Sequence, residues 1–105
     1  MTFKNFKNFI QTELAAIEKR LAHLDREKRL LAYTVKISEE QGELSEALLS
    51  YLSLQRKDKT QVGKAEMAGE VADVIITASL LAEALGIDFE QALEKKIAKI
   101  KKRRY

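Results

Sequence analysis

The stretch VADVIITASLLAEAL, residues 71–85, decides the fold class of this chain. It is apolar nearly all round the helical axis, and a helix with such a pattern is normally buried by its neighbours. Gly86 follows the last leucine, as expected for a glycine that ends a helix, and Asp88 is placed to cap the helix after it. We therefore expect a central helix over about residues 61–85 and a last helix that ends near residue 103.

The sequence on both sides of this stretch also has helical periodicity. Apolar residues repeat at helical spacing over about residues 3–22, with Thr2 as the expected cap, and again over about residues 26–55. The polar run Gln55–Gln61 is the expected loop before the central helix. With no proline and no strand pattern, we predict an all-α protein, an antiparallel four-helix bundle that forms a single domain over residues 1–105.

Composition excludes several classes of protein. The chain has no cysteine, so disulfides and thiolate metal sites are excluded, and no long uncharged apolar run predicts a signal peptide or a membrane span. We expect a cytoplasmic protein. The net charge is +3, but residues 95–104 carry seven Lys or Arg and no acid, which leaves 12 basic and 16 acidic residues elsewhere. This basic end has three interpretations: a solvated helix terminus, a phosphate-binding segment or a nucleic-acid-binding surface.

Two pairs of acids lie at helix positions where apolar residues are expected. Because a helix turns about 100° per residue, residues three and four apart share a face. In the second predicted helix, Glu40 and Glu43 lie on the apolar stripe and Glu39 lies on its edge. In the central helix, Glu70 and Asp73 repeat the spacing of three. We therefore predict that the two pairs face inward and meet across the bundle.

Four inward carboxylates would repel one another. A pair about 4 Å apart costs on the order of 4 kcal/mol at an effective dielectric constant near 20, and an unpaired buried charge is costly by itself. A divalent cation removes both problems, and oxygen ligands without histidine or cysteine favour Mg²⁺ or Mn²⁺ over Zn²⁺. Structural ion pairing is the alternative, for which Lys36 is the nearby cation on the second predicted helix.

The segments EEQGE, residues 39–43, and EVAD, residues 70–73, are separated by 26 residues. This pattern resembles the EExxE…ExxD signature of MazG-like nucleotide pyrophosphohydrolases, in the all-α superfamily that also contains the dimeric dUTPases. The resemblance covers about residues 36–103 and includes the run EVADVIITASLLAEALGIDFEQAL. It implies Mg²⁺-dependent hydrolysis of a nucleoside triphosphate to a nucleoside monophosphate and pyrophosphate.

Matched by position, the resemblance also implies roles for single residues. The implied Mg²⁺ ligands are Glu40, Glu43, Glu70 and Asp73. Glu39 would orient or deprotonate the attacking water. Lys96 and Arg103 match basic positions of the family's last helix, and with Lys99 they are the candidates for binding phosphate. Ile100 stands where the family often has asparagine, which leaves the sugar and phosphate contacts open.

Two functions other than nucleotide pyrophosphohydrolase stay open. One is a non-catalytic helical interaction or regulatory protein on the same scaffold. The other is a nucleic-acid-binding protein that uses the basic C-terminal end. Inward acids have no use in a pure interaction module, and the basic residues gather at one end instead of along a face. Because three neighbouring helices cannot cover the apolar central helix, we predict a homodimer or homotetramer.

Overall fold

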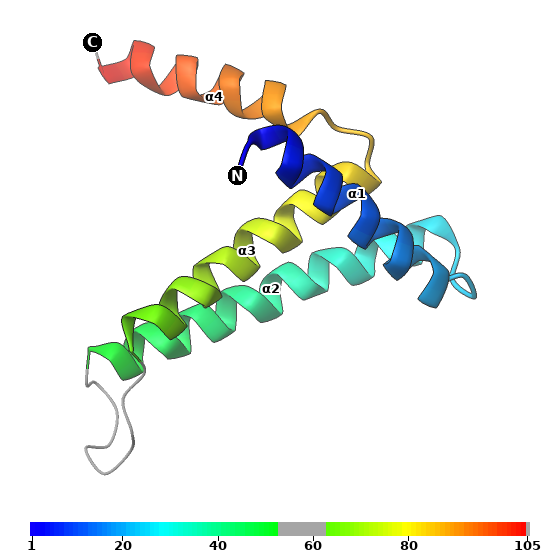
Figure 1. The fold of residues 1–105 in the computed structure, drawn as a ribbon, viewed down its shortest axis with the longest axis horizontal. Coiled ribbons are helices and arrows are strands. Elements are labelled where there is room, and N and C mark those ends of the chain that lie inside the picture. The colour runs from blue at the N-terminus through cyan, green and yellow to red at the C-terminus, as the bar shows by residue number, and fades with distance from the viewer. Residues whose placement is uncertain (53–62, 105) are drawn as a thin grey trace. The chain divides into compact units, whose positions relative to one another are not determined.

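The computed structural model describes residues 1–52 and 63–104. Their regular structure consists of the helices α1 (Phe3–Arg20), α2 (Arg26–Tyr51), α3 (Lys64–Ala84) and α4 (Phe89–Arg104) (Figure 1). The prediction of an all-α protein is confirmed for this part of the chain. The antiparallel bundle, its completion by a second copy and the single domain stay predictions. None of the described helices combines the length and the apolar character needed to cross a membrane.

The helix bounds differ from the predicted ones between α2 and α3. The predicted loop Gln55–Gln61 lies outside the described residues, as does the predicted end of the second helix. The predicted start of the central helix near residue 61 is wrong, because Gly63 is not helical. The carbonyl of Gly63 accepts the backbone N–H of Met67 at 3.1 Å, so this glycine is the residue before the first turn of α3, which begins at Lys64.

Capping interactions begin and end the helices close to the predicted positions. Thr2 Oγ1 accepts the N–H of Asn5 at 3.1 Å, and Asp88 Oδ1 accepts the N–H of Gln91 at 3.1 Å. Each cap satisfies an amide that has no partner inside the helix. At the end of α3, Gly86 has a φ of 72°, and its amide and the next one donate to carbonyls of the last turn at 3.0 and 2.9 Å. This pair of bonds is the usual glycine termination of a helix.

The described residues form two compact units. The first contains Met1–Leu30 and the chain from Ser79 to the end of α4. Within it, Phe3 and Phe6 on α1 pack against Phe89 at the start of α4, with ring centroids 5.5 and 6.0 Å from that of Phe89. This aromatic cluster joins the first helix to the last, and the ring of Phe89 is buried.

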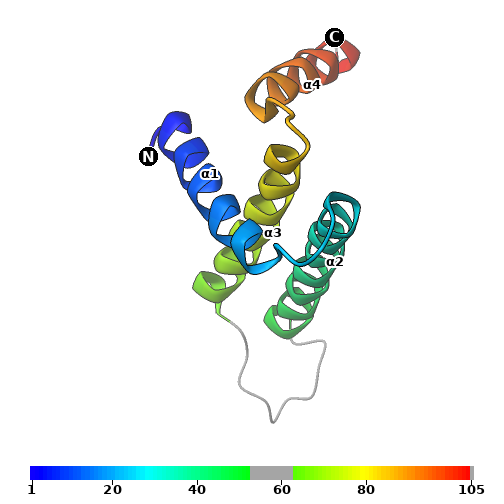
Figure 2. The same cartoon turned by 90° about the vertical axis from the view of Figure 1, so that its right-hand side faces the viewer.

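The second unit, Leu31–Ala78, consists of most of α2 and most of α3. In both views these two helices lie side by side, with the C-terminal end of α2 next to the N-terminal end of α3 (Figure 1, Figure 2). Tyr33 and Ala47 are buried in this unit, together with the carboxylate-bearing residue Glu40. The helix pair therefore contains all the acids that the sequence predicts as metal ligands.

The central helix is only partly buried in the single chain. In α3, Val71 is 43% exposed and Ile75 is 53% exposed. Within its unit α3 has one neighbour, α2, and one neighbouring helix covers only one face. The single chain therefore leaves part of α3 uncovered within Leu31–Ala78, as expected from its apolar pattern, and the burial of this part by a second copy stays a prediction.

Candidate metal centre

Three carboxylates from two helices meet in the second unit. Glu40 and Glu43 come from α2 and Glu70 comes from α3, and one oxygen of each lies within 4.8 Å of the oxygens of the other two. The spacing of three residues places Glu40 and Glu43 on one face of α2. The pairing of α2 with α3 adds Glu70. We call these three residues the acid group, and its geometry could hold a metal ion.

Burial differs among the members of the acid group. Glu40 is 7% exposed, Glu70 is half-buried and Glu43 is exposed. The Oε2 atoms of Glu40 and Glu70 are buried and have no hydrogen-bond partner among the described residues. A buried carboxylate oxygen without a partner is rare and costly. These two oxygens, in a set made only of carboxylates, are therefore the structural observation that fits a bound divalent cation.

The charges of Glu40 and Glu70 act on Glu43. Repulsion by Glu40 is the largest cause that raises the pKa of Glu43, followed by loss of hydration, and the charge of Glu70 acts in the same direction. The positive charge of Lys36 opposes these effects. The raised pKa of Glu43 indicates that its neighbouring acids disfavour its ionised form.

Lys36 forms the ion pairs that the sequence offers as the alternative to a metal. Its Nζ lies 3.3 Å from Glu39 Oε2 and 3.5 Å from Glu40 Oε1. The hydrogen bond with Glu39 is the largest cause that raises the pKa of Lys36, so its ammonium stays charged. One ammonium cannot neutralise Glu39 and the whole acid group, because Glu43 and Glu70 add two further charges. These ion pairs therefore leave negative charge in the acid group that Lys36 does not balance.

Asp73 lies outside the acid group. Its side chain is exposed and is not among the carboxylates that meet, although it lies three residues from Glu70 as Glu43 does from Glu40. The prediction that four acids face inward is therefore wrong for the single chain, in which Glu43 is also exposed. Of the two α3 acids, only Glu70 joins Glu40 and Glu43. The assignment of Asp73 as a fourth ligand stays a prediction, as do the ligand roles of the acid group.

The predicted phosphate-binding residues lie on α4, in the other compact unit. Lys96, Lys99 and Arg103 are exposed. Their spacing of three and four places them along one face of this helix. Ile100, at the position where an asparagine was expected from the resemblance, is 43% exposed. The phosphate-binding role of the three basic residues stays a prediction, and so does the role of Glu39 toward water.

The described helices and the acid group place this protein in a class: all-α proteins with a candidate divalent-cation centre. A family model, described as the MazG-like family, matches residues 31–105. The match spans more than half of the chain, so the chain belongs to the MazG-like family, and the resemblance is confirmed. Family membership suggests a function of the nucleotide pyrophosphohydrolase type. No curated protein and no solved structure matches the chain.

Proposed function

We propose that this protein is a Mg²⁺-dependent nucleoside triphosphate pyrophosphohydrolase that converts an NTP or dNTP to the monophosphate and pyrophosphate. The observation that supports it most is the acid group, with two buried carboxylate oxygens that have no partner among the described residues. It occurs in a chain of the MazG-like family. Ligands that are all carboxylates suit Mg²⁺, with Mn²⁺ as a substitute.

In this proposal the chain's own residues divide the work by position. The proposed Mg²⁺ ligands are Glu40, Glu43, Glu70 and Asp73. The bound ion would neutralise phosphate charge and make a water molecule more acidic. Glu39, the neighbour of Glu40, orients or deprotonates the attacking water. Lys96, Lys99 and Arg103 bind the phosphates and stabilise the negative charge that grows on the leaving pyrophosphate.

The proposed working form is a homodimer or homotetramer in the cytoplasm. In the second unit, Val71 and Ile75 on α3 and Leu31 and Val35 on α2 are each at least 43% exposed. Large apolar side chains exposed on both helices of one unit are typical of a surface that another chain covers. A second copy is the simplest such chain, because symmetric homo-oligomers are the commonest assemblies.

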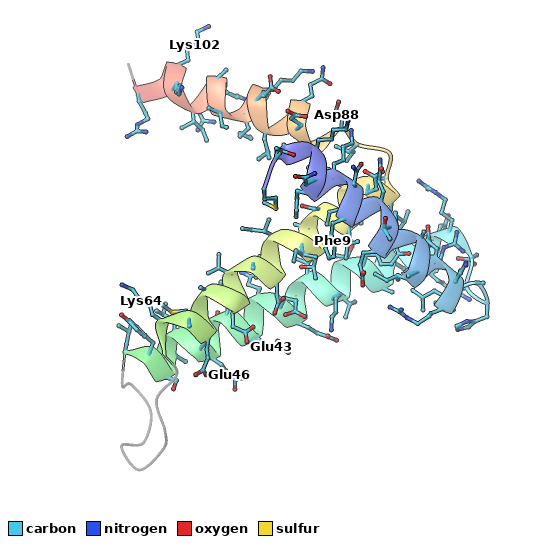
Figure 3. The ribbon with its side chains drawn as sticks, in the orientation of Figure 1. Phe9, Glu43, Glu46, Lys64, Asp88 and Lys102 are labelled. Carbon is cyan, nitrogen blue, oxygen red and sulfur yellow. The ribbon has the colours of Figure 1, made fainter. Side chains whose placement is uncertain are left out.

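The direct test is pyrophosphate release from a panel of canonical and modified NTPs and dNTPs, with Mg²⁺ or with EDTA. We expect turnover of one or a few nucleotides that stops in EDTA. Glu70→Gln removes a proposed ligand and should lower kcat/KM by at least about 100-fold, since even residues that only orient ligands cost about 10- to 100-fold. Glu46→Gln, on α2 but outside the acid group, is the matched control and should keep the activity (Figure 3).

Two outcomes would contradict the proposed function. Turnover that is unchanged in EDTA or in Glu70→Gln would exclude the acid group as the catalytic centre. Absence of turnover on the whole panel, with Mg²⁺ still raising the melting temperature of the wild type, would favour a metal-binding regulatory protein on the same scaffold. Binding to random DNA that weakens steeply with salt would instead favour the nucleic-acid interpretation of the basic end.

A further inference from the structure

Lys36 is the basic residue that forms an ion pair with a member of the acid group. Its Nζ contacts Glu39 Oε2 and Glu40 Oε1 at 3.3 and 3.5 Å. Among the described residues, no other lysine or arginine forms an ion pair with Glu39 or with the acid group. The lysine precedes the two glutamates by three and four residues, so all three side chains lie on one face of α2.

The two oxygens of Glu40 have different surroundings. Oε1 is paired with Lys36, whereas Oε2 is buried and has no partner among the described residues. The side chain of Glu40 is 10% exposed and that of Lys36 is 56% exposed. One carboxylate is thus shared between an exposed cation on one side and the proposed cation site on the other.

A divalent cation bound at the acid group would lie close to the ammonium of Lys36. Two positive charges that use the same carboxylate repel each other, and the repulsion is partly screened because the lysine reaches solvent. Lysine can respond to this repulsion, because its flexible four-carbon stem lets the ammonium move without moving the backbone. Glu39, on the exposed edge, remains available to it as a partner.

From this geometry we propose that Lys36 is a built-in competitor that sets the affinity of the acid group for its divalent cation. In the metal-free chain it pairs with both Glu39 and Glu40. When the cation binds, Lys36 releases Glu40 and keeps Glu39. The inference rests on the proposed metal site and adds a residue that weakens binding, so that the ion exchanges instead of being held permanently.

Calorimetric titration with Mn²⁺ and Mg²⁺ in the absence of nucleotide tests this role. Lys36→Gln should bind the ion about three- to tenfold more tightly than the wild type, because one repelling charge is removed. Lys36→Arg keeps the charge and should stay close to the wild type. Lys64→Gln is the matched control: it makes the same change in net charge in the same unit, at a position six residues before Glu70 and about 9 Å along α3 (Figure 3).

Thermal unfolding gives a second readout that does not depend on activity. In EDTA, Lys36→Gln should melt below the wild type, because Glu39 and Glu40 lose their counter-ion. Saturating Mg²⁺ should then raise the melting temperature of the variant by more than it raises that of the wild type. Lys36→Met, which keeps most of the apolar stem, should behave like Lys36→Gln and provides the same test if the glutamine variant folds poorly.

The outcomes separate the two proposals. If the wild type binds Mn²⁺ and Mg²⁺ but Lys36→Gln binds them equally or more weakly, the competitor role is overturned and the metal site stands. If Lys64→Gln tightens binding as much as Lys36→Gln, the effect is one of net charge and the role of Lys36 is again overturned. If the wild type binds neither ion, the metal site and the role of Lys36 fall together.

Discussion

Glu40 is an acid that is buried although its carboxylate is only partly paired. It is the most buried acid of the acid group, it pairs with Lys36 through one oxygen, and its other oxygen has no partner among the described residues. Its negative charge also raises the pKa of Glu43, one turn further along α2. A buried charge in this position lowers the stability of the metal-free chain. Binding of a cation to the folded chain would offset this loss.

The metal-free protein should therefore lose stability as the pH rises through the titration range of Glu43. The pKa of Glu43 is raised in the folded chain above its ordinary value of 4.5. Between the ordinary and the raised value the folded chain binds more protons than the unfolded chain. By linkage, the corresponding stability is fully present below the ordinary pKa and is lost as the pH rises through the raised pKa.

Urea unfolding in EDTA across the acidic and neutral range measures this effect. Glu43→Gln should make the free energy of unfolding less dependent on pH and should be more stable than the wild type at neutral pH, because it removes the repelled charge. The same variant should respond less to Mg²⁺. A variant with the same pH dependence as the wild type in EDTA would show that the repulsion has no influence on folding.

At the scale of elements, two glycines, one inside α3 and one just after it, have opposite effects on stability. Gly86 ends the helix with a φ of 72°, a conformation that an L side chain adopts only with strain. Gly69 lies inside the helix, where a Cβ would meet no atom within 4 Å. The first glycine is needed for its backbone conformation. The second is not needed for its conformation. It lowers the stability of α3, because glycine loses more conformational freedom on folding than other residues do.

Alanine at these two positions should therefore change stability in opposite directions. Gly86→Ala should lower the free energy of unfolding by about 1 kcal/mol, and Gly69→Ala should raise it by about 0.5–1 kcal/mol. Chemical unfolding followed by circular dichroism measures both, and each variant serves as the control for the other. A loss of stability in Gly69→Ala would show that another chain approaches α3 closely at this position.

At the scale of the whole molecule, the second unit of a single chain has large apolar side chains exposed on its surface. Val71 and Ile75 lie four residues apart on α3 and therefore share a face. This face is not the one that carries Glu70 toward α2, because Val71 is turned by about 100° from Glu70. The helix can thus contribute to the acid group and to a contact with a second copy at the same time.

A charge on this face should separate the proposed oligomer. Ile75→Glu should convert a dimer or tetramer to a monomer at micromolar concentration, because the carboxylate would be buried at the contact without a partner. Ile75→Val keeps an apolar side chain of similar shape and should keep the assembly. Light scattering coupled to size exclusion measures the mass, and a wild type that is already monomeric would contradict the proposed assembly.

Much of the fold was predictable because helices depend on contacts between residues a few positions apart. Thr2, Asp88 and Gly86 act at the predicted helix ends. The spacing of the acids, together with the apolar helix and the basic end that follow it, indicated the family that the chain belongs to. The start of α3 was predicted too early because the apolar period does not show where the first turn begins. Gly63 was the available signal for the start that the structure shows.

The sequence by itself determined the four helices and the face of its own helix on which each acid lies, because both follow from the angle between successive residues. Only the tertiary structure decided that Glu70 meets Glu40 and Glu43 while Asp73 stays exposed, and that Lys36 pairs with two acids at once. The physical reason is that the first result depends on how α3 is rotated against α2, and the second on the side-chain rotamers along α2. Neither is set by the spacing of residues along the chain.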